Sequence, residues 1–295
     1  QKPIFDHYRV DAQKFWKEVN ELPNYYRKNG LDLIVPDTVY LNHFITYARD
    51  GIFKGLNNRR LREFGAEIEF YKGLPEFFDT IKHFVKANPV HRQHDIRVEN
   101  YIVSTGLRQM ILGSKIAPYV DGVWGAEFVE NPPQPGYLDP AGANAPRSSK
   151  IISQIAYALD NTTKTRAIFE INKGTNKISD IDVNAQIPDE DRRVPIQNMV
   201  YIADGPSDIP VFSIVNRFGG RTFAVYRPGS AEEFSQVNRL QKQGRVQSYG
   251  EAEYTQGSQT AMWIENAVSE IAEYIVTNRQ RALGDKIGKP PKHLD

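Results

Sequence analysis

The chain has 295 residues, of which 40% are hydrophobic and 25% charged, so it has an ordinary globular composition and a length typical of about two domains. This composition excludes collagen-like and low-complexity chains, and the absence of cysteine excludes disulfides, thiolate zinc sites and cysteine nucleophiles. Lysine and arginine (37) balance aspartate and glutamate (36) to a net charge of +1, so the basic footprint of a nucleic-acid-binding protein is missing.

Residues 1–70 have the pattern of a small helical domain. Asp11 is suited to cap a helix, because apolar residues follow it at helical spacing: Phe15, Val19 and Leu22. Two more helices are expected over residues 37–51 and 58–64. The stretch is rich in aromatic residues that could line a substrate pocket. A small helical domain needs such residues for its own core, so we expect most of them to be buried.

From Gly73 onward, strand and helix patterns alternate. Leu74-Pro75-Glu76 heads a helix with proline in its first turn, and a strand rich in β-branched residues follows over residues 96–103. Further strands are expected at 123–128, 199–203 and 222–226, and helices at 107–120, 148–160, 164–173, 207–218, 231–243 and 260–282. This alternation indicates an α/β fold with a doubly wound, mainly parallel sheet.

Two segments outside this alternation are expected to be irregular. Residues 131–149 are rich in proline, glycine and alanine, which predicts a long loop or flap over one face of the core. The tail from Gly284 carries lysines among prolines and predicts a poorly ordered end. The expected organisation is therefore a helical domain (1–70), an α/β core (71–283) and a flexible tail (284–295).

The chain as given shows no membrane or export signal. It has no run of about 18 apolar residues, the length needed to span a bilayer. Its first residues also lack the apolar core of a signal peptide. We therefore expect a cytoplasmic protein with no membrane partner.

The strongest local signal is the segment MVYIADGPSD at residues 199–208. An apolar strand runs into Asp204, the chain turns at Gly205-Pro206, and Asp208 begins a helix. Carboxylates at the carboxyl end of a strand lie where open α/β sheets bind ligands, and such oxygen ligands suit Mg²⁺. The alternative is that Asp204 belongs only to a turn and Asp208 only to a helix cap.

A second signal is Ser104-Thr105-Gly106, a run of small residues between a strand and a helix. Ser104 can donate its hydroxyl to a phosphoryl oxygen, and Thr105 and Gly106 can add their backbone N–H groups. The same run is also common as a plain strand-to-helix connection. Lys173 offers a cation, and although a single lysine is more often a solvated surface charge, this one lies between the other two signals in sequence.

Taken together, these segments resemble the haloacid dehalogenase (HAD) superfamily of phosphotransferases. Its chains carry a Ser or Thr after one strand, a Lys later, and a paired-Asp segment after a further strand. Here the order is Ser104, Lys173, then Asp204 and Asp208. The lysine is the least fixed position of the pattern, and Lys164 is the fallback.

The resemblance covers nearly the whole chain. The helix headed by residues 73–76 fits the family's approach to the Ser motif, and residues 1–70 stand where the family inserts a cap. The resemblance therefore implies a HAD-like Rossmannoid core with an N-terminal helical cap.

One part of the family pattern is missing. Its first motif is an Asp-x-Asp pair after an N-terminal strand, and the first Asp is the nucleophile. No strand precedes Asp6, and the pairs at 180–182 and 189–191 come too late in the order. The missing strand would also be the middle strand of the sheet, so its loss would leave unpaired backbone groups in the core. We expect that the sequence given begins just after this motif, and the alternative is a degenerate, inactive relative.

The resemblance implies Mg²⁺-dependent hydrolysis of a small phosphate monoester through an aspartyl-phosphate, with the nucleophile upstream of Gln1. Asp204 and Asp208 would hold the metal, directly or through water. Residues 104–106 and Lys173 would bind the phosphoryl group and offset its charge. The alternatives are an inactive HAD-like binding or regulatory protein, or a dehalogenase or other hydrolase of the superfamily. Dehalogenases of this group need no metal, so the paired-Asp segment favours the phosphatase.

Overall fold

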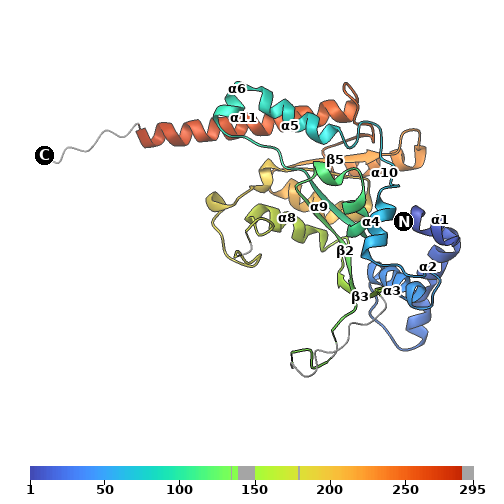
Figure 1. Cartoon of the computed structure of the whole chain (residues 1–295). Helices are drawn as coiled ribbons and strands as arrows, with labels where there is room; N and C mark the ends of the chain where they lie inside the picture. The colour runs from blue at the N-terminus through green and yellow to red at the C-terminus, as the bar shows by residue number, and fades with distance from the viewer. Residues whose placement is uncertain (134, 139–149, 179, 288–295) are drawn as a thin grey trace. The chain divides into compact units, whose positions relative to one another are not determined.

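The computed structural model describes residues 1–133, 135–138, 150–178 and 180–287 (Figure 1). The chain divides into two compact units. The first joins Gln1–Glu69 to Tyr101–Lys164, and the second joins Phe70–Asn100 to the chain from Thr165 onward. The boundary expected at residue 70 coincides with the end of the first segment, but the expected core (71–283) is itself shared between the two units.

The first unit combines helices with a small sheet. Its elements are α1 (Lys2–Tyr8), α2 (Ala12–Lys28), α3 (Pro36–Arg49), α4 (Asn58–Gly65), β1 (Tyr101–Leu107), α7 (Arg108–Gly113), a 3-10 turn (Ala117–Tyr119), β2 (Gly122–Glu130) and β3 (Ile152–Tyr157). The three helices expected here, α2 to α4, are confirmed. Asp11 caps α2, because its carboxylate accepts hydrogen bonds from the backbone N–H groups of Gln13 (2.8 Å) and Lys14 (3.2 Å).

The sheet of the first unit has the order β1-β2-β3, with β1 parallel and β3 antiparallel to β2. The strand expected at 96–103 was placed too early, since β1 starts at Tyr101. The helix expected at 148–160 was wrong, because β3 occupies this stretch. Ile152 and Ile155 have the three-residue spacing of a helix face, and the pairing with β2, a contact distant in sequence, overrides that local pattern.

The helices of residues 1–69 share one hydrophobic core with the sheet of their unit. Buried aromatic residues from the helices (Phe5, Phe15, Phe44, Phe53) belong to the same cluster as residues of β1, α7, β2 and β3 (Leu107, Met110, Ala126, Phe128, Ile152). The expectation that most of these aromatic residues form core is confirmed, and Tyr25, 61% exposed, is an exception. Because helices and sheet each bury one face against the other, the predicted cap is not a separate body from β1–β3.

Helices α4 and α7 cross with their backbones in contact. A Cβ atom on Gly65 would lie 2.1 Å from the carbonyl oxygen of Met110, and one on Gly113 would lie 1.9 Å from that of Arg62. These distances are too short for any side chain, so only glycine allows this crossing.

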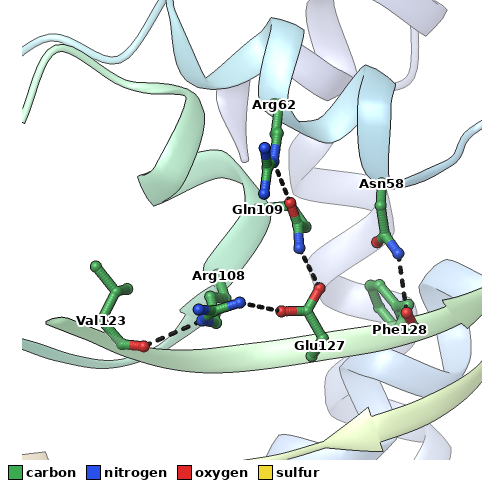
Figure 2. A network of polar contacts seen from close by, with 7 residues as sticks. All are labelled: Asn58, Arg62, Arg108, Gln109, Val123, Glu127 and Phe128. Atoms are coloured by element: carbon green, nitrogen blue, oxygen red, sulfur yellow. Dashed lines mark hydrogen bonds and ion pairs between the residues drawn. The ribbon is translucent and has the colours of Figure 1, made fainter. Parts of the chain in front are cut away.

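A polar network fastens the same crossing to β2 (Figure 2). Arg62 of α4 donates to Gln109 (2.5 Å), and Gln109 donates to one oxygen of Glu127 (2.5 Å). The other oxygen of Glu127 accepts from Arg108 (3.0 Å), which also donates to the carbonyl of Val123 (3.1 Å). Two helices and a strand are thereby connected through groups that satisfy one another.

The second unit alternates strands and helices, as expected. Its elements are α5 (Phe77–Ala87), α6 (Pro89–Gln93), α8 (Lys164–Lys173, whose first residue belongs to the first unit), 3-10 turns at Asp189–Asp191, Ile196–Asn198 and Pro206–Asp208, β4 (Val200–Ala203), α9 (Ile209–Arg217), β5 (Arg221–Tyr226), α10 (Ala231–Lys242), β6 (Ser248–Glu251) and α11 (Gln259–Ile287). The sheet β4-β5-β6 is entirely parallel, with Ala203 opposite Ala224 and Tyr226 opposite Glu251. Strand β6 was not predicted.

Helix α11 runs beside α5 and α6 (Figure 1). It continues to Ile287, beyond the expected end at residue 282, so the first residues of the predicted tail are helical. The rest of that tail, 288–295, and much of the predicted flap, 134 and 139–149, lie outside the described residues. In the described part of the chain, no helix combines the length and the apolar character that a membrane crossing requires.

The fold is thus mixed α/β with small, mostly parallel sheets. The structure describes two three-stranded sheets rather than one continuous doubly wound sheet. Each sheet ends in a strand, β1 or β4, that pairs with a neighbour on one side only among the described strands.

Candidate functional site

The paired-Asp segment forms the connection between β4 and α9. Asp204 follows β4 directly and is exposed, and the 3-10 turn Pro206–Asp208 leads into the helix. Asp208 is only 3% exposed, and its two carboxylate oxygens accept hydrogen bonds from the hydroxyls of Tyr201 (2.5 Å) and Ser207 (2.7 Å). The turn at the carboxyl end of a parallel strand is confirmed, and it presents one accessible and one buried carboxylate.

Burial and negative charge keep Tyr201 a neutral donor to Asp208. Burial raises the pKa of Tyr201 far above its usual value, and the charge of Asp208, the hydrogen bond to it and the charge of Asp204 add to the shift. The pKa of Tyr254 is raised to about 12 by burial, with smaller contributions from Tyr71 and Asp204. Asp204 therefore lies within electrostatic range of two tyrosines of its unit.

Helix α10 brings an amide to the same turn. A Cβ atom on Gly205 would lie 3.1 Å from the side-chain nitrogen of Gln236. Sequence reasoning missed both Gln236 and the role of Tyr201. Tyr201 had a local signal, since it is the polar-tipped residue of an otherwise aliphatic strand. Gln236 had none, because the fold of the unit brings α10 to this turn.

The donor chemistry of this turn fits part of a magnesium site. Mg²⁺ keeps several waters and needs only one or two protein carboxylates. Asp204 has no hydrogen-bond or ion-pair partner among the residues that the structure describes, so its oxygens can serve as ligands. Asp208 has both oxygens engaged and would fix the turn. No group of three or more His, Cys, Asp or Glu side chains suited to a metal occurs in the described part of the chain.

The Ser104-Thr105-Gly106 run lies inside β1, where the pairing with β2 is irregular, and not after the strand. The backbone N–H of Gly106 donates to the hydroxyl oxygen of Ser104 (3.0 Å). The Tyr40 hydroxyl donates to the carbonyl of Thr105. The Gly106 N–H expected to bind an anion is therefore already used, whereas the half-buried Ser104 hydroxyl still has its hydrogen to donate.

The two candidate lysines have different surroundings. The ammonium of Lys173, at the end of α8, donates to the carbonyls of Val183 (2.6 Å) and Ala185 (2.8 Å), so it fastens the loop that follows its helix. Lys164 begins α8, is 5% exposed and belongs to the unit that contains Ser104. Lys173 belongs, with Asp204 and Asp208, to the other unit.

The Tyr201 hydrogen bond gives a direct prediction. Tyr201→Phe leaves one oxygen of a buried carboxylate without this donor, and we expect the free energy of unfolding to fall by about 1–3 kcal/mol. Tyr226→Phe on β5 is the matched control, because that hydroxyl donates no hydrogen bond within the described residues, and its expected change is below about 0.5 kcal/mol. Urea denaturation of both variants measures the difference. Equal losses in the two variants would contradict the role given to Tyr201.

Comparisons with known proteins identify a relative. No family model matches the chain, and no solved structure matches it. A protein of Borreliella burgdorferi, described as uncharacterized, is 40% identical over 270 residues, which cover 90% of this chain and 89% of the relative. Identity at this level over nearly the full length of both proteins means that the chain belongs to the same family as this Borreliella burgdorferi protein.

Proposed function

We propose that this protein is a Mg²⁺-dependent hydrolase of small phosphate monoesters, of the HAD type. The observation that carries the proposal is the pair of carboxylates after β4. The outer carboxylate, Asp204, is exposed and unpartnered among the described residues, and the inner one, Asp208, is buried and fixed by two hydroxyls. An accessible ligand on a rigid turn is what a metal site needs in order to hold its geometry.

In this proposal Asp204 binds the metal, and Asp208 holds the turn in place. A bound Mg²⁺ would supply positive charge to the oxygens of the phosphoryl group. Ser104 donates its hydroxyl to a phosphoryl oxygen. Substitution of Ser104 by alanine tests its part in the proposal.

Of the two lysines, Lys164 is the better partner for the phosphoryl group in this proposal. Lys173 already uses two of its three N–H donors on backbone carbonyls. Lys164 is buried in the unit of Ser104, where a cation acts in a medium of lower dielectric constant and interacts more strongly with an anion.

The nucleophile is proposed to be a carboxylate on a strand upstream of Gln1. Its oxygen attacks phosphorus, the P–O bond to the alcohol breaks, and water then hydrolyses the aspartyl-phosphate to release inorganic phosphate. Strands β1 and β4 both offer an edge to such a strand, because each pairs on one side only among the described strands.

Two lysine variants of a protein extended through the upstream strand test the assignment of the cation. We expect Lys164→Met to lower kcat/KM for para-nitrophenyl phosphate by about 100-fold or more, because the variant loses the positive charge that stabilises the phosphoryl group during its transfer. Lys173→Met is expected to keep activity within about 5-fold and to lower the melting temperature, since a charged donor to two carbonyls is removed. Release of inorganic phosphate with Mg²⁺ measures the first effect. If instead Lys173→Met loses more activity than Lys164→Met, Lys173 is the residue that binds the phosphoryl group.

A second candidate function is a HAD-like protein that binds phosphorylated molecules without hydrolysing them. It is favoured by the sequence given, in which no Asp-x-Asp pair follows a strand before Ser104. Hydrolysis by the extended protein would decide against it. With either function, we propose that the protein is located in the cytoplasm.

A further inference from the structure

Helix α3 contacts the Ser104-Thr105 segment of its own unit through Tyr40. Tyr40 is 6% exposed, and its hydroxyl donates to the carbonyl of Thr105. Asp37 precedes Tyr40 by three positions on the helix, so the two side chains lie on one face of α3. Asp37 is therefore on the side of the helix that meets the predicted phosphoryl-binding residues.

Two further charged groups of this unit act electrostatically on Asp37. Helix α3 packs against β3, and the chain after β3 leads to Asp160, whose carboxylate accepts the backbone N–H groups of Thr162 and Thr163 (both 2.7 Å). Lys164 follows and is buried. Burial raises the pKa of Asp37, the charge of Asp160 raises it further, and the charge of Lys164 opposes both effects. The cluster thus holds two carboxylates and one ammonium.

The Asp37 carboxylate accepts one hydrogen bond, from its own backbone N–H, and this bond lowers its pKa slightly. Asp37 is half-buried, and no donor side chain forms a hydrogen bond or ion pair with it among the described residues. A carboxylate has about four lone-pair sites, and one that is partly buried beside another carboxylate is costly when a single donor serves it. Such a group has capacity for a hydrogen-bond donor that comes from a ligand.

We propose that Asp37 binds a donor group on the alcohol part of the phosphate ester whose phosphoryl group is held by Ser104 and Lys164. The assignment rests on the proposed function, and it narrows the substrate class to phosphate monoesters with a hydroxyl or an amine near the phosphate. The net negative charge of the three-residue cluster favours an ammonium over a hydroxyl. Asp37 is thus a specificity-determining residue of this site.

Three esters that share a two-carbon chain separate these chemistries: 2-aminoethyl, 2-hydroxyethyl and ethyl phosphate. Their binding to residues 1–295 is measured by ligand-observed NMR titration. We expect 2-aminoethyl phosphate to bind at least about 10-fold more tightly than ethyl phosphate, with the hydroxyl ester between them, because a charge-assisted hydrogen bond is gained. Asp37→Asn should remove that preference and leave the affinity for ethyl phosphate within about 2-fold. Asp32→Asn, at an exposed aspartate shortly before α3, is the matched control and should keep the preference.

Thermal unfolding at pH 7 checks the fold of the variant. Because the pKa of Asp37 is raised, ionising it costs stability as the pH rises through that pKa, so Asp37→Asn should keep or raise the melting temperature. Equal affinities for the three esters, no binding of any of them, or an equal loss for all three in Asp37→Asn would overturn the assignment. If Asp37 sets the preference among the esters but the extended protein hydrolyses none of them, only the proposed hydrolase function is wrong. If the extended protein hydrolyses phosphate esters but Asp37 sets no preference, only the present inference is wrong.

Discussion

Asp204→Asn is expected to lower Mg²⁺-dependent hydrolysis of a phosphate monoester by at least about 100-fold in the protein extended through its upstream strand, because a metal ligand loses its charge. The fold should stay intact, since Asp204 is exposed and has no partner among the described residues. The measurements are phosphate release over a range of Mg²⁺ concentrations, and the melting temperature.

Glu232→Gln is the matched control for this variant. Glu232 is an exposed carboxylate on α10 of the same unit, and its substitution should leave hydrolysis unchanged. Unchanged hydrolysis in Asp204→Asn, or an equal loss in both variants, would remove Asp204 from the metal site.

Residues 1–295 are expected to hydrolyse no phosphate monoester, whereas the protein extended through the upstream strand is expected to do so. A covalent route needs a carboxylate in line with the phosphoryl group. In the sequence, no Asp-x-Asp pair follows a strand before Ser104. Ser104 does not replace the carboxylate, because among the described residues no base accepts a hydrogen bond from its hydroxyl, and its oxygen already accepts from Gly106. A para-nitrophenyl phosphate assay on both proteins, with and without Mg²⁺, makes the comparison.

The control for this comparison is the extended protein with its first upstream aspartate changed to asparagine, which should be as inactive as residues 1–295. Robust Mg²⁺-dependent turnover by residues 1–295 would refute the argument for a missing nucleophile. An inactive extended protein that does carry the Asp-x-Asp pair would favour the binding function instead.

The turn after β4 could be predicted from the sequence because its determinants are local. An apolar strand, a Gly-Pro turn and a helix-starting Asp208 follow one another within ten residues, 199–208. Helices with a clear cap and apolar spacing, such as α2 after Asp11, were predicted for the same reason.

Elements that depend on distant partners could not be predicted in this way. Strand β3 was taken for a helix because its pairing with β2 does not show in its own pattern. The short strand β6 was missed, and the common core of the N-terminal helices with β1–β3 contradicts a division based on composition alone. Likewise, the two carbonyls that bind Lys173 come from a loop whose fold the sequence pattern does not reveal.

The crossing of α4 and α7 has a mechanical consequence. Side chains normally separate two helices and let them slide or roll by changing rotamers, and at Gly65 and Gly113 this layer is absent. A displacement of α4 therefore moves α7 directly. Helix α7 in turn moves the end of β1, because β1 directly precedes α7 in the chain. Within this unit, a displacement of α4 therefore also displaces the end of β1, the strand that carries Ser104, and with it the Ser104 hydroxyl.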